Sequence, residues 1–500
     1  MPVKQNIVAN IFANAWMAVI SIAMVPLYIH FIGIESYGLL GVFGTLQAIT
    51  SLLDMGLSMT MNREMARYSS KLNNSDQVRS LVRTLEVIYW AIAFLIWISI
   101  WLLAPFLSQN WITSANLSKD IIRQAILLNG LAMFFLWPQS FYEGGLMGLQ
   151  KQVLLSKVKI GAATMRALGA VIILWLISPT IQAFLGWQIV INITFTVLIA
   201  LILWRNLPGA AMPSFQVNQL RKVWRFSVGV AAISMLGVVL TQADKVILSK
   251  LLTLDKFGYY TIAGTMSTVV LMLVNPVYNA IFPRLSQLIA TNDQDGMRRF
   301  YHQSAQVMTV LVVPIVVILA LFSSQILLIW QGNPVTVENT YWLMTLFVIS
   351  TGLQGLAHIP WALQLAQGWT RLGFYINLVA IPILLPLLFL LVSSYGALGA
   401  AFGLIFFNLS SLLTSVLFMH RKFLKGELMQ WLVEDVGIPS LAVLVIAGLG
   451  RLIVPVNTSR LLLLVFIVVV SGLSQLTAVL VTPMVRSWIF TKIVDRRNLV

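Results

Sequence analysis

The chain is a succession of fourteen apolar segments, each roughly 20 to 27 residues long, separated by short and mostly basic connectors. A helix of about 20 apolar residues crosses the hydrocarbon of a bilayer. We therefore predict an all-α polytopic membrane protein with about 14 transmembrane helices and almost no room for a soluble domain. The predicted spans are 7–30, 38–60, 84–107, 123–147, 156–177, 181–204, 226–252, 258–282, 302–323, 340–365, 373–392, 396–419, 437–456 and 461–484.

The composition limits the chemistry that the chain can perform. Hydrophobic residues make up 59% of the sequence and charged residues 10%, whereas a soluble protein is about 25% charged. The absence of Cys excludes disulfides, a thiol nucleophile and thiolate metal ligands. The four His are scattered without metal-ligand spacing, and the sequence has no G-x-S-x-G, P-loop or H-E-x-x-H motif. We expect no metal, no cofactor and no enzymatic activity.

The net charge of +16 is explained by membrane topology rather than by nucleic-acid binding. With the N-terminus in the cytoplasm, 24 of the 32 Lys and Arg residues fall on the cytoplasmic side, six fall on the other side, and Arg166 and Lys245 lie within spans. This distribution follows the positive-inside rule. An even number of spans places the C-terminus in the cytoplasm as well. Some of the basic residues should contact anionic lipid headgroups.

Two stretches of the sequence resemble each other. Segments 32–43 (IGIESYGLLGVF) and 252–264 (LTLDKFGYYTIAG) share an acidic residue, an aromatic residue and a glycine, with Gly38 and Gly258 lying 220 residues apart. Nearly the same offset relates Arg63 to Arg284, Asp76 to Asp295, Arg79 to Arg298 and Pro138 to Pro360. These landmarks predict a duplication in which each repeat holds six spans in the same orientation.

The duplication predicts the domain organisation. We expect an N-terminal lobe over 1–204, a cytoplasmic linker over 205–225 and a C-terminal lobe over 226–419, followed by two extra helices and a tail over 420–500. The segment 425–436 fits either a short interfacial amphipathic helix or an ordinary connector. Two parallel lobes indicate a transporter that binds its substrate near the bilayer midplane and exposes it alternately to the two sides.

Arg166 is the clearest charged residue within a span. It lies about six residues past the basic cytoplasmic edge, which is roughly 10 Å into the membrane, and small residues flank it in KIGAATMRALGA. One interpretation is a cation that lines a central cavity and binds a phosphate through its forked donors. The alternative is an Arg that extends back to the cytoplasmic headgroups.

Five further residues complete the candidate substrate-binding set. Asp244 and Lys245 are neighbours in span 226–252 and point roughly 100° apart on a helix, so they should not pair face to face. Lys245 is a candidate for contact with an anionic substrate, and Asp244 for a proton or cation site; the alternative is that the span ends earlier. Asp54 fits better a structural pairing with a nearby Arg. Arg63 and Arg284 are the equivalent basic residues of the two repeats.

The order of several motifs resembles the polysaccharide flippases of the multidrug/oligosaccharidyl-lipid/polysaccharide exporter superfamily. They are the first helix with Asn10 and Asn14, then PLYIHFIGIESYGLLGVF (26–43), LLDMGLSMTMNREMAR (52–67), ADKVILSKLLTLDKFGYYTIAG (243–264), IFPRLSQL (281–288) and SYGALGAAFG (394–403). The resemblance covers nearly the whole chain. It implies two six-helix lobes around a central cavity, with two further helices at the end.

The resemblance also implies a function. It predicts a bacterial inner-membrane flippase that moves undecaprenyl-diphosphate-linked oligosaccharide to the periplasmic leaflet, for O-antigen, capsule or another surface polymer. It implies that cavity cations, here Arg166 and Lys245, bind the diphosphate while the lipid tail stays outside. The expected partners are this lipid-linked glycan, membrane lipids and other polysaccharide assembly proteins, without nucleic acid. Ion coupling, with Asp244 as the first candidate, is plausible for the superfamily.

Three other classes remain open. A multidrug exporter of the same superfamily often carries cationic substrates and should line its cavity with carboxylates. A membrane polysaccharide polymerase or ligase should present Arg or His in a sizeable periplasmic loop, whereas the longest loop on that side, 108–122, has about 15 residues. A channel fits least, because the chain has no repeat of short, ring-forming subunits.

Overall fold

The described part of the chain is helical. A computed structural model describes residues 2–54, 56–69, 75–207, 215, 235–455 and 458–487. Within these ranges, eleven helices are long and apolar enough to cross a membrane. The only β-type pairing that the described residues form is an isolated bridge between Thr113 and Thr253. The predicted all-α polytopic fold is confirmed.

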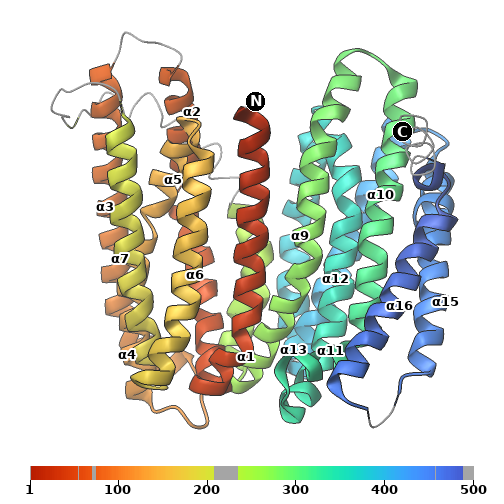
Figure 1. Ribbon diagram of the computed structural model, residues 1–500. Coiled ribbons are helices and arrows are strands. Elements are labelled where there is room, and N and C mark those ends of the chain that lie inside the picture. Colours follow the sequence, from red (N-terminus) through yellow and green to blue (C-terminus); the bar gives the residue numbers. More distant parts are fainter. Residues whose placement is uncertain are drawn as a thin grey trace, which may run out of the picture. The chain divides into compact units, whose positions relative to one another are not determined.

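The chain divides into two compact units, Met1–Gly258 and Tyr259–Val500, coloured from red to yellow-green and from green to blue in Figure 1. Helices that begin in the first unit are α1 (Pro2–Thr50), η1 (Ser51–Asp54), α2 (Leu57–Ser69), α3 (Ser75–Phe106), the π-helical η2 (Leu107–Trp111), α4 (Lys119–Leu136), α5 (Gln139–Gly148), α6 (Gln152–Leu176), α7 (Ile181–Asn206), a helix over 235–251, and α9 (Leu254–Ala290). The second unit continues with α10 (Gln294–Leu321), α11 (Ser323–Gln331), α12 (Pro334–Ala366), α13 (Thr370–Phe423), α14 (Leu428–Gln430), the π-helical η3 (Trp431–Gly437), α15 (Ile438–Leu452) and α16 (Arg460–Val481).

Eleven long helices accommodate thirteen crossings because two of them are interrupted, and the helix over 235–251 corresponds to the fourteenth. α1 leaves helical geometry at Gly33, where φ is 81°, and α13 does so at Gly396, where φ is 59°. Glycine adopts these positive φ values without the steric cost that a Cβ imposes. Each helix therefore corresponds to two predicted spans. The predicted span 226–252 is helical over 235–251, and its first part lies outside the described residues.

Proline divides one predicted span in two. The segment 123–147 forms α4 and α5, which are separated at Trp137 and Pro138. Proline has no N–H to donate, and its ring clashes with the preceding turn. The break turns Gln139 toward α7, where its Nε2 donates a hydrogen bond of 2.9 Å to Thr196 Oγ1.

The unit boundary at Gly258 falls later in the chain than the predicted linker, of which only 205–207 and 215 are described. The helix over 235–251 is attached to the first unit at its end. Trp111 Nε1 donates to Ser249 Oγ at 3.0 Å, and Leu254 N donates to Thr113 O at 2.9 Å. The lobe boundaries 1–204, 226–419 and 420–500 stay predictions.

The segment 425–436 is not an ordinary connector, because most of it is helical; its placement at the membrane interface stays a prediction. From Leu428 it runs through α14 and η3 into α15, so that 428–452 is one long helical segment. Trp431 and Asp435 are buried in it. In Figure 1, α15 and α16 lie beside α10, and they share an apolar core with it that includes Val310, Val443 and Ile467.

Candidate substrate cavity in the first unit

Arg166 lies in a cavity of the first unit whose lining is partly polar. The cavity has a volume of about 420 Å³ and is lined by residues of α1, α4, α6 and α7. Its polar lining residues are Ser21, Tyr28, Gln47, Asn129, Arg166, Gln188 and Asn192. The volume falls within the range of about 300 to 1,000 Å³ that is typical of small-molecule sites. The first unit thus provides a partly open cavity in which polar groups gather around Arg166 on a largely apolar wall.

The Arg166 guanidinium uses few of its hydrogen-bond donors. Nη2 donates to Asn192 Oδ1 at 2.8 Å, and Asn192 Nδ2 donates in turn to Ala132 O at 3.0 Å. The second bond orients the amide so that its oxygen faces Arg166. The buried Nε of Arg166 has no hydrogen-bond partner, and among the described residues no carboxylate lies within ion-pair distance of this guanidinium. The cavity therefore contains a positive charge that no ion pair neutralises.

Small residues of α6 bring α7 close to this charge. A Cβ on Gly169 would lie 2.2 Å from the ring of Trp187, and Trp187 Nε1 donates to Met165 O at 3.1 Å. Ala163 and Ala167 line the cavity itself. Small side chains at helix contacts allow this approach in membrane proteins.

Asp54 lies in a neighbouring cavity of about 410 Å³ that shares Gln47, Met133 and Leu136 with the first. Its carboxylate accepts hydrogen bonds from Ser58 Oγ at 2.8 Å and from the Tyr89 hydroxyl. The predicted pairing of Asp54 with an Arg is wrong, because two hydroxyl donors satisfy the carboxylate instead. Asp54 nevertheless faces a cavity, as a substrate-binding residue would.

The second cavity also contains an ion pair. Glu143 of α5 lines the cavity and bonds Lys159 Nζ of α6 at 2.8 Å. Both side chains are largely buried, so Lys159 offsets most of the negative charge that Glu143 would otherwise present. The two adjoining cavities therefore differ in character, with an unneutralised cation in one and two carboxylates in the other.

The remaining predicted site residues do not line these cavities. Arg63 pairs with Glu64 at 2.8 Å, and exposed Arg284 donates to Gln287 at 3.3 Å. Lys245 is partly buried and donates to Gln242 Oε1 at 3.2 Å. Asp244 is buried, and no ion pair joins it to Lys245, as expected for adjacent helical residues. The structure brings Arg166 and Asp54 to adjoining cavities and leaves the other four outside them.

Neutral amides of the cavity were missed from the sequence. Gln188, Asn192 and Thr196 recur every fourth residue in the middle of α7, where Thr194 is the one other polar residue between them. This spacing places the three on one face of a helix. Gln188 and Asn192 line the cavity with Arg166, and Thr196 bonds Gln139. A polar stripe of this kind would have marked the helix face that meets the cavity.

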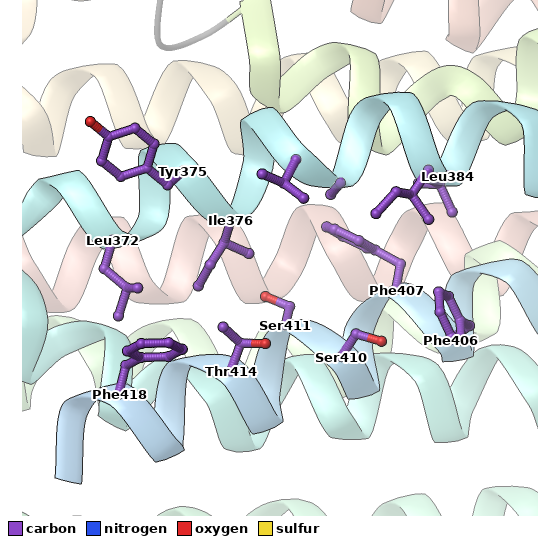
Figure 2. Close-up of a pocket in the computed structure, with 13 residues that line it drawn as sticks. Leu372, Tyr375, Ile376, Leu384, Phe406, Phe407, Ser410, Ser411, Thr414 and Phe418 are labelled. Carbon is purple, nitrogen blue, oxygen red and sulfur yellow. The ribbon is translucent and has the colours of Figure 1, made fainter. Parts of the chain in front are cut away.

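The second unit contains a groove of a different character (Figure 2). It has a volume of about 490 Å³ and lies between the two halves of α13, lined by residues between Leu372 and Phe418. Its lining is aliphatic and aromatic, apart from Tyr375 and the hydroxyls of Ser410, Ser411 and Thr414. No charged side chain lines it, so it offers no counter-charge to an anionic headgroup.

A bundle of membrane-spanning helices with polar cavities inside it is the architecture of a membrane transporter. Residues 29–334 match the family described as "Polysaccharide biosynthesis protein", and the chain belongs to this family. It is 22% identical to the Shigella flexneri protein named "Putative O-antigen transporter", over 80% of this chain and 94% of the relative. Membership of the exporter superfamily that the sequence motifs resembled is confirmed.

Solved structures share the fold. The lipid II flippase MurJ in an inward closed conformation superposes with a TM-score of 0.71 at 12% identity, over 97% of this chain and 99% of MurJ. An inward-facing multidrug resistance MATE family transporter of the MOP superfamily has a TM-score of 0.66 at 11% identity, over 83% and 96%. The relatives are named as transporters and a flippase, in keeping with transport rather than catalysis.

Proposed function

We propose that the protein is a flippase that moves undecaprenyl-diphosphate-linked oligosaccharide from the cytoplasmic to the periplasmic leaflet of the bacterial inner membrane by alternating access. Both termini lie in the cytoplasm in this proposal, and the product serves surface polysaccharide synthesis. The observation that carries the proposal is Arg166, whose guanidinium lies in a cavity beside amide and hydroxyl groups and has no ion-pair partner among the described residues.

A guanidinium suits a diphosphate for geometric reasons. Its planar fork can donate two parallel hydrogen bonds to phosphate oxygens, and Arg166 spends only one of its donors on Asn192. Amide and hydroxyl groups that line the same cavity, such as Gln188 and Ser21, can hydrogen-bond sugar hydroxyls. In this arrangement Arg166 recognises the charge that all such carriers share, while the amides contact the variable glycan.

The energetics of flipping also favour a cation in the cavity that receives the headgroup. An unpaired charge cannot enter hydrocarbon at acceptable cost. A cavity that supplies a counter-charge lowers this cost for the diphosphate, while the isoprenoid tail gains nothing from leaving the lipid. The protein therefore needs to enclose only the headgroup.

A multidrug exporter of the same superfamily is the second candidate, because Asp54 lines the adjoining cavity. Carboxylates would attract cationic drugs. The first proposal is favoured because Asp54 is held by two hydroxyls and Glu143 is paired with Lys159, whereas Arg166 retains its charge. The family description and the named relative point in the same direction.

The test is transport by purified protein in proteoliposomes that contain a fluorescent undecaprenyl-diphosphate oligosaccharide. Appearance of the glycan in the opposite leaflet is followed with a membrane-impermeant reagent. We expect Arg166→Ala to abolish transport and Arg166→Lys to retain a part of it. Lys157→Ala is the matched control, because Lys157 is an exposed cation on the same helix. Full transport by Arg166→Ala at normal protein level would refute the role of Arg166, and drug transport without glycolipid transport would favour the exporter.

A further inference from the structure

The second unit contains a buried cluster in which one histidine lies between two carboxylates. His302 of α10 has its Nδ1 at 2.5 Å from Asp435 Oδ2 and its Nε2 at 3.1 Å from Glu427 Oε2. The side chain of His302 is 3% exposed and that of Asp435 is 0% exposed. Asp435 lies in the π-helical η3, a type of helix that is rare and frequent at functional sites. The cluster belongs to none of the cavities described above.

The geometry indicates how many protons the cluster holds. A carboxylate can only accept hydrogen bonds, and a neutral imidazole carries a hydrogen on only one nitrogen. Both contacts of His302 are hydrogen bonds to ionised carboxylates only when the ring is protonated on both nitrogens. With one proton fewer, an imidazole lone pair would face a carboxylate in a buried site, which is costly. The observed arrangement is therefore that of the proton-loaded state.

Groups on neighbouring elements complete the site. Arg298, one helical turn before His302, bonds Glu427 Oε1 through Nε at 3.4 Å. Gln306, one turn after it, donates to Asp435 Oδ1 at 2.9 Å. With Arg298, His302 and both carboxylates charged, the site is neutral overall. Loss of one proton leaves one net negative charge among buried groups, and no other cation within ion-pair distance is present in the described residues.

Two further polar groups beside His302 lack partners. His420 of α13 donates through Nδ1 to Val416 O at 2.9 Å, so its Nε2 carries a lone pair, and this atom is buried without a hydrogen bond. The hydroxyl of Tyr301 is likewise buried and unpaired. The Tyr301 ring lies between the two histidines, with centroids 5.4 Å from His302 and 5.7 Å from His420. The Nε2 of His420, an unpaired proton acceptor, is thus separated from His302 by the ring of Tyr301.

Glu427 connects the cluster to solvent. Its side chain is 18% exposed, and that of its partner Arg298 is 46% exposed, whereas the groups behind them are closed off. Both residues lie at the side of the bilayer that the positive-inside rule assigns to the cytoplasm. A proton from water can therefore reach His302 through one intervening carboxylate.

We propose that His302, Asp435 and Glu427 form a proton-binding site that fastens the C-terminal helices to α10. On loading, Glu427 takes one proton from hydronium and passes it to the imidazole, which becomes imidazolium; on release the same proton returns to water. No other bond is made or broken. The contact extends to the residues just after α16 through Gln306, whose Oε1 accepts from Met484 N at 2.9 Å.

The sign of the pH dependence follows from the proton count. The segment 428–452 packs most tightly onto α10 while the site holds its proton. The packing weakens as rising pH removes this proton. The apolar core shared by α10, α15 and α16 keeps the helices associated, so we expect loosening of the segment around Glu427 and Asp435 rather than detachment of the pair.

Nitrogen NMR of protein labelled with ¹⁵N-histidine tests the proton directly. The chain has only four histidines, His30, His302, His358 and His420, and His302→Gln assigns the signal. We expect an imidazolium signal at pH 6 that is absent from His302→Gln and disappears by pH 9. A neutral His302 across this range, or a signal that does not respond to pH, overturns the proposal.

Hydrogen exchange of 424–437 tests the coupling to docking, after correction for the intrinsic pH dependence of exchange. We expect protection in the wild type to fall about tenfold between pH 6 and pH 9. Asp435→Asn should remove this pH response. Because Asn has nearly the same shape as Asp, the variant should still fold. Glu434→Gln is the matched control, since Glu434 is the exposed neighbour of Asp435 on the same segment. Equal pH responses in all three proteins overturn the proposal.

Discussion

Gly38 and Gly258, the glycines that the predicted repeat pairs, lie in one helix contact, in which Gly38 packs against Leu254 and Gly258 while Gly258 packs against Ile34. A Cβ on Gly38 would lie 3.0 Å from Gly258 N and 2.1 Å from Leu254 O. A Cβ on Gly258 would lie 2.6 Å from Ile34 O. Only glycine allows the backbones to approach this closely. The residue type at both positions, which lie 220 residues apart in the sequence, is therefore constrained by the same contact.

Gly38→Ala should destabilise the protein. The new methyl group would meet backbone atoms, which cannot rotate away, and overpacking of this kind costs about 1–3 kcal/mol. Thermal unfolding in detergent should show a lower midpoint than for the wild type. Gly161→Ala is the control, because a Cβ at that position meets nothing within 4 Å. An unchanged midpoint for Gly38→Ala would show that the contact is looser than its geometry implies.

Asp54 and Tyr89 should be coupled in stability. Tyr89 is fully buried, and its hydroxyl donates to Asp54. Asp54→Ala leaves this hydroxyl without an acceptor, at a cost of about 1–3 kcal/mol. Tyr89→Phe removes the donor, so Asp54→Ala should cost less in the Tyr89→Phe background. Unfolding midpoints of the two single variants and the double variant measure the coupling, and additive effects would contradict it.

Glu143 should impair transport of an anionic substrate once Lys159 is removed. Lys159→Met leaves an unpaired carboxylate in the cavity adjoining that of Arg166, and we expect the initial rate of glycolipid transport to fall about tenfold, as for loss of about 1.4 kcal/mol. Glu143→Gln added to Lys159→Met should restore most of the rate in the proteoliposome assay. A double variant as slow as Lys159→Met would assign the loss to packing.

Lys245 should matter more for transport than an exposed cation does. Lys245 is partly buried and tethered to Gln242, whereas Lys157 is exposed. We expect Lys245→Ala to lower the transport rate and Lys157→Ala to leave it within about twofold of the wild type, a difference below 0.5 kcal/mol. Protein levels are compared by immunoblot. Equal rates for the two variants would argue against substrate contact by Lys245.

The candidate site was partly visible in the sequence. Arg166 was marked because a charge within an apolar span is costly and therefore retained for a reason, and the structure puts it in a cavity. Asp54 was expected beside an Arg and instead bonds Tyr89, which lies 35 residues away. Asn192, the residue that orients Arg166, was missed because a single neutral amide in a helix carries little signal by itself.

The sequence by itself determined the all-helical membrane fold with about fourteen crossings, and it predicts the basic side of the bilayer and the internal repeat. These follow from the cost of placing charges and unsatisfied backbone groups in hydrocarbon, which acts on each segment separately. Only the tertiary structure decided which helices are neighbours. A membrane helix satisfies its own backbone hydrogen bonds, so its lateral partners depend on side-chain shape and polar pairing. The pairing of His302 with Asp435, 133 residues apart, and the cavity around Arg166 are products of that lateral packing.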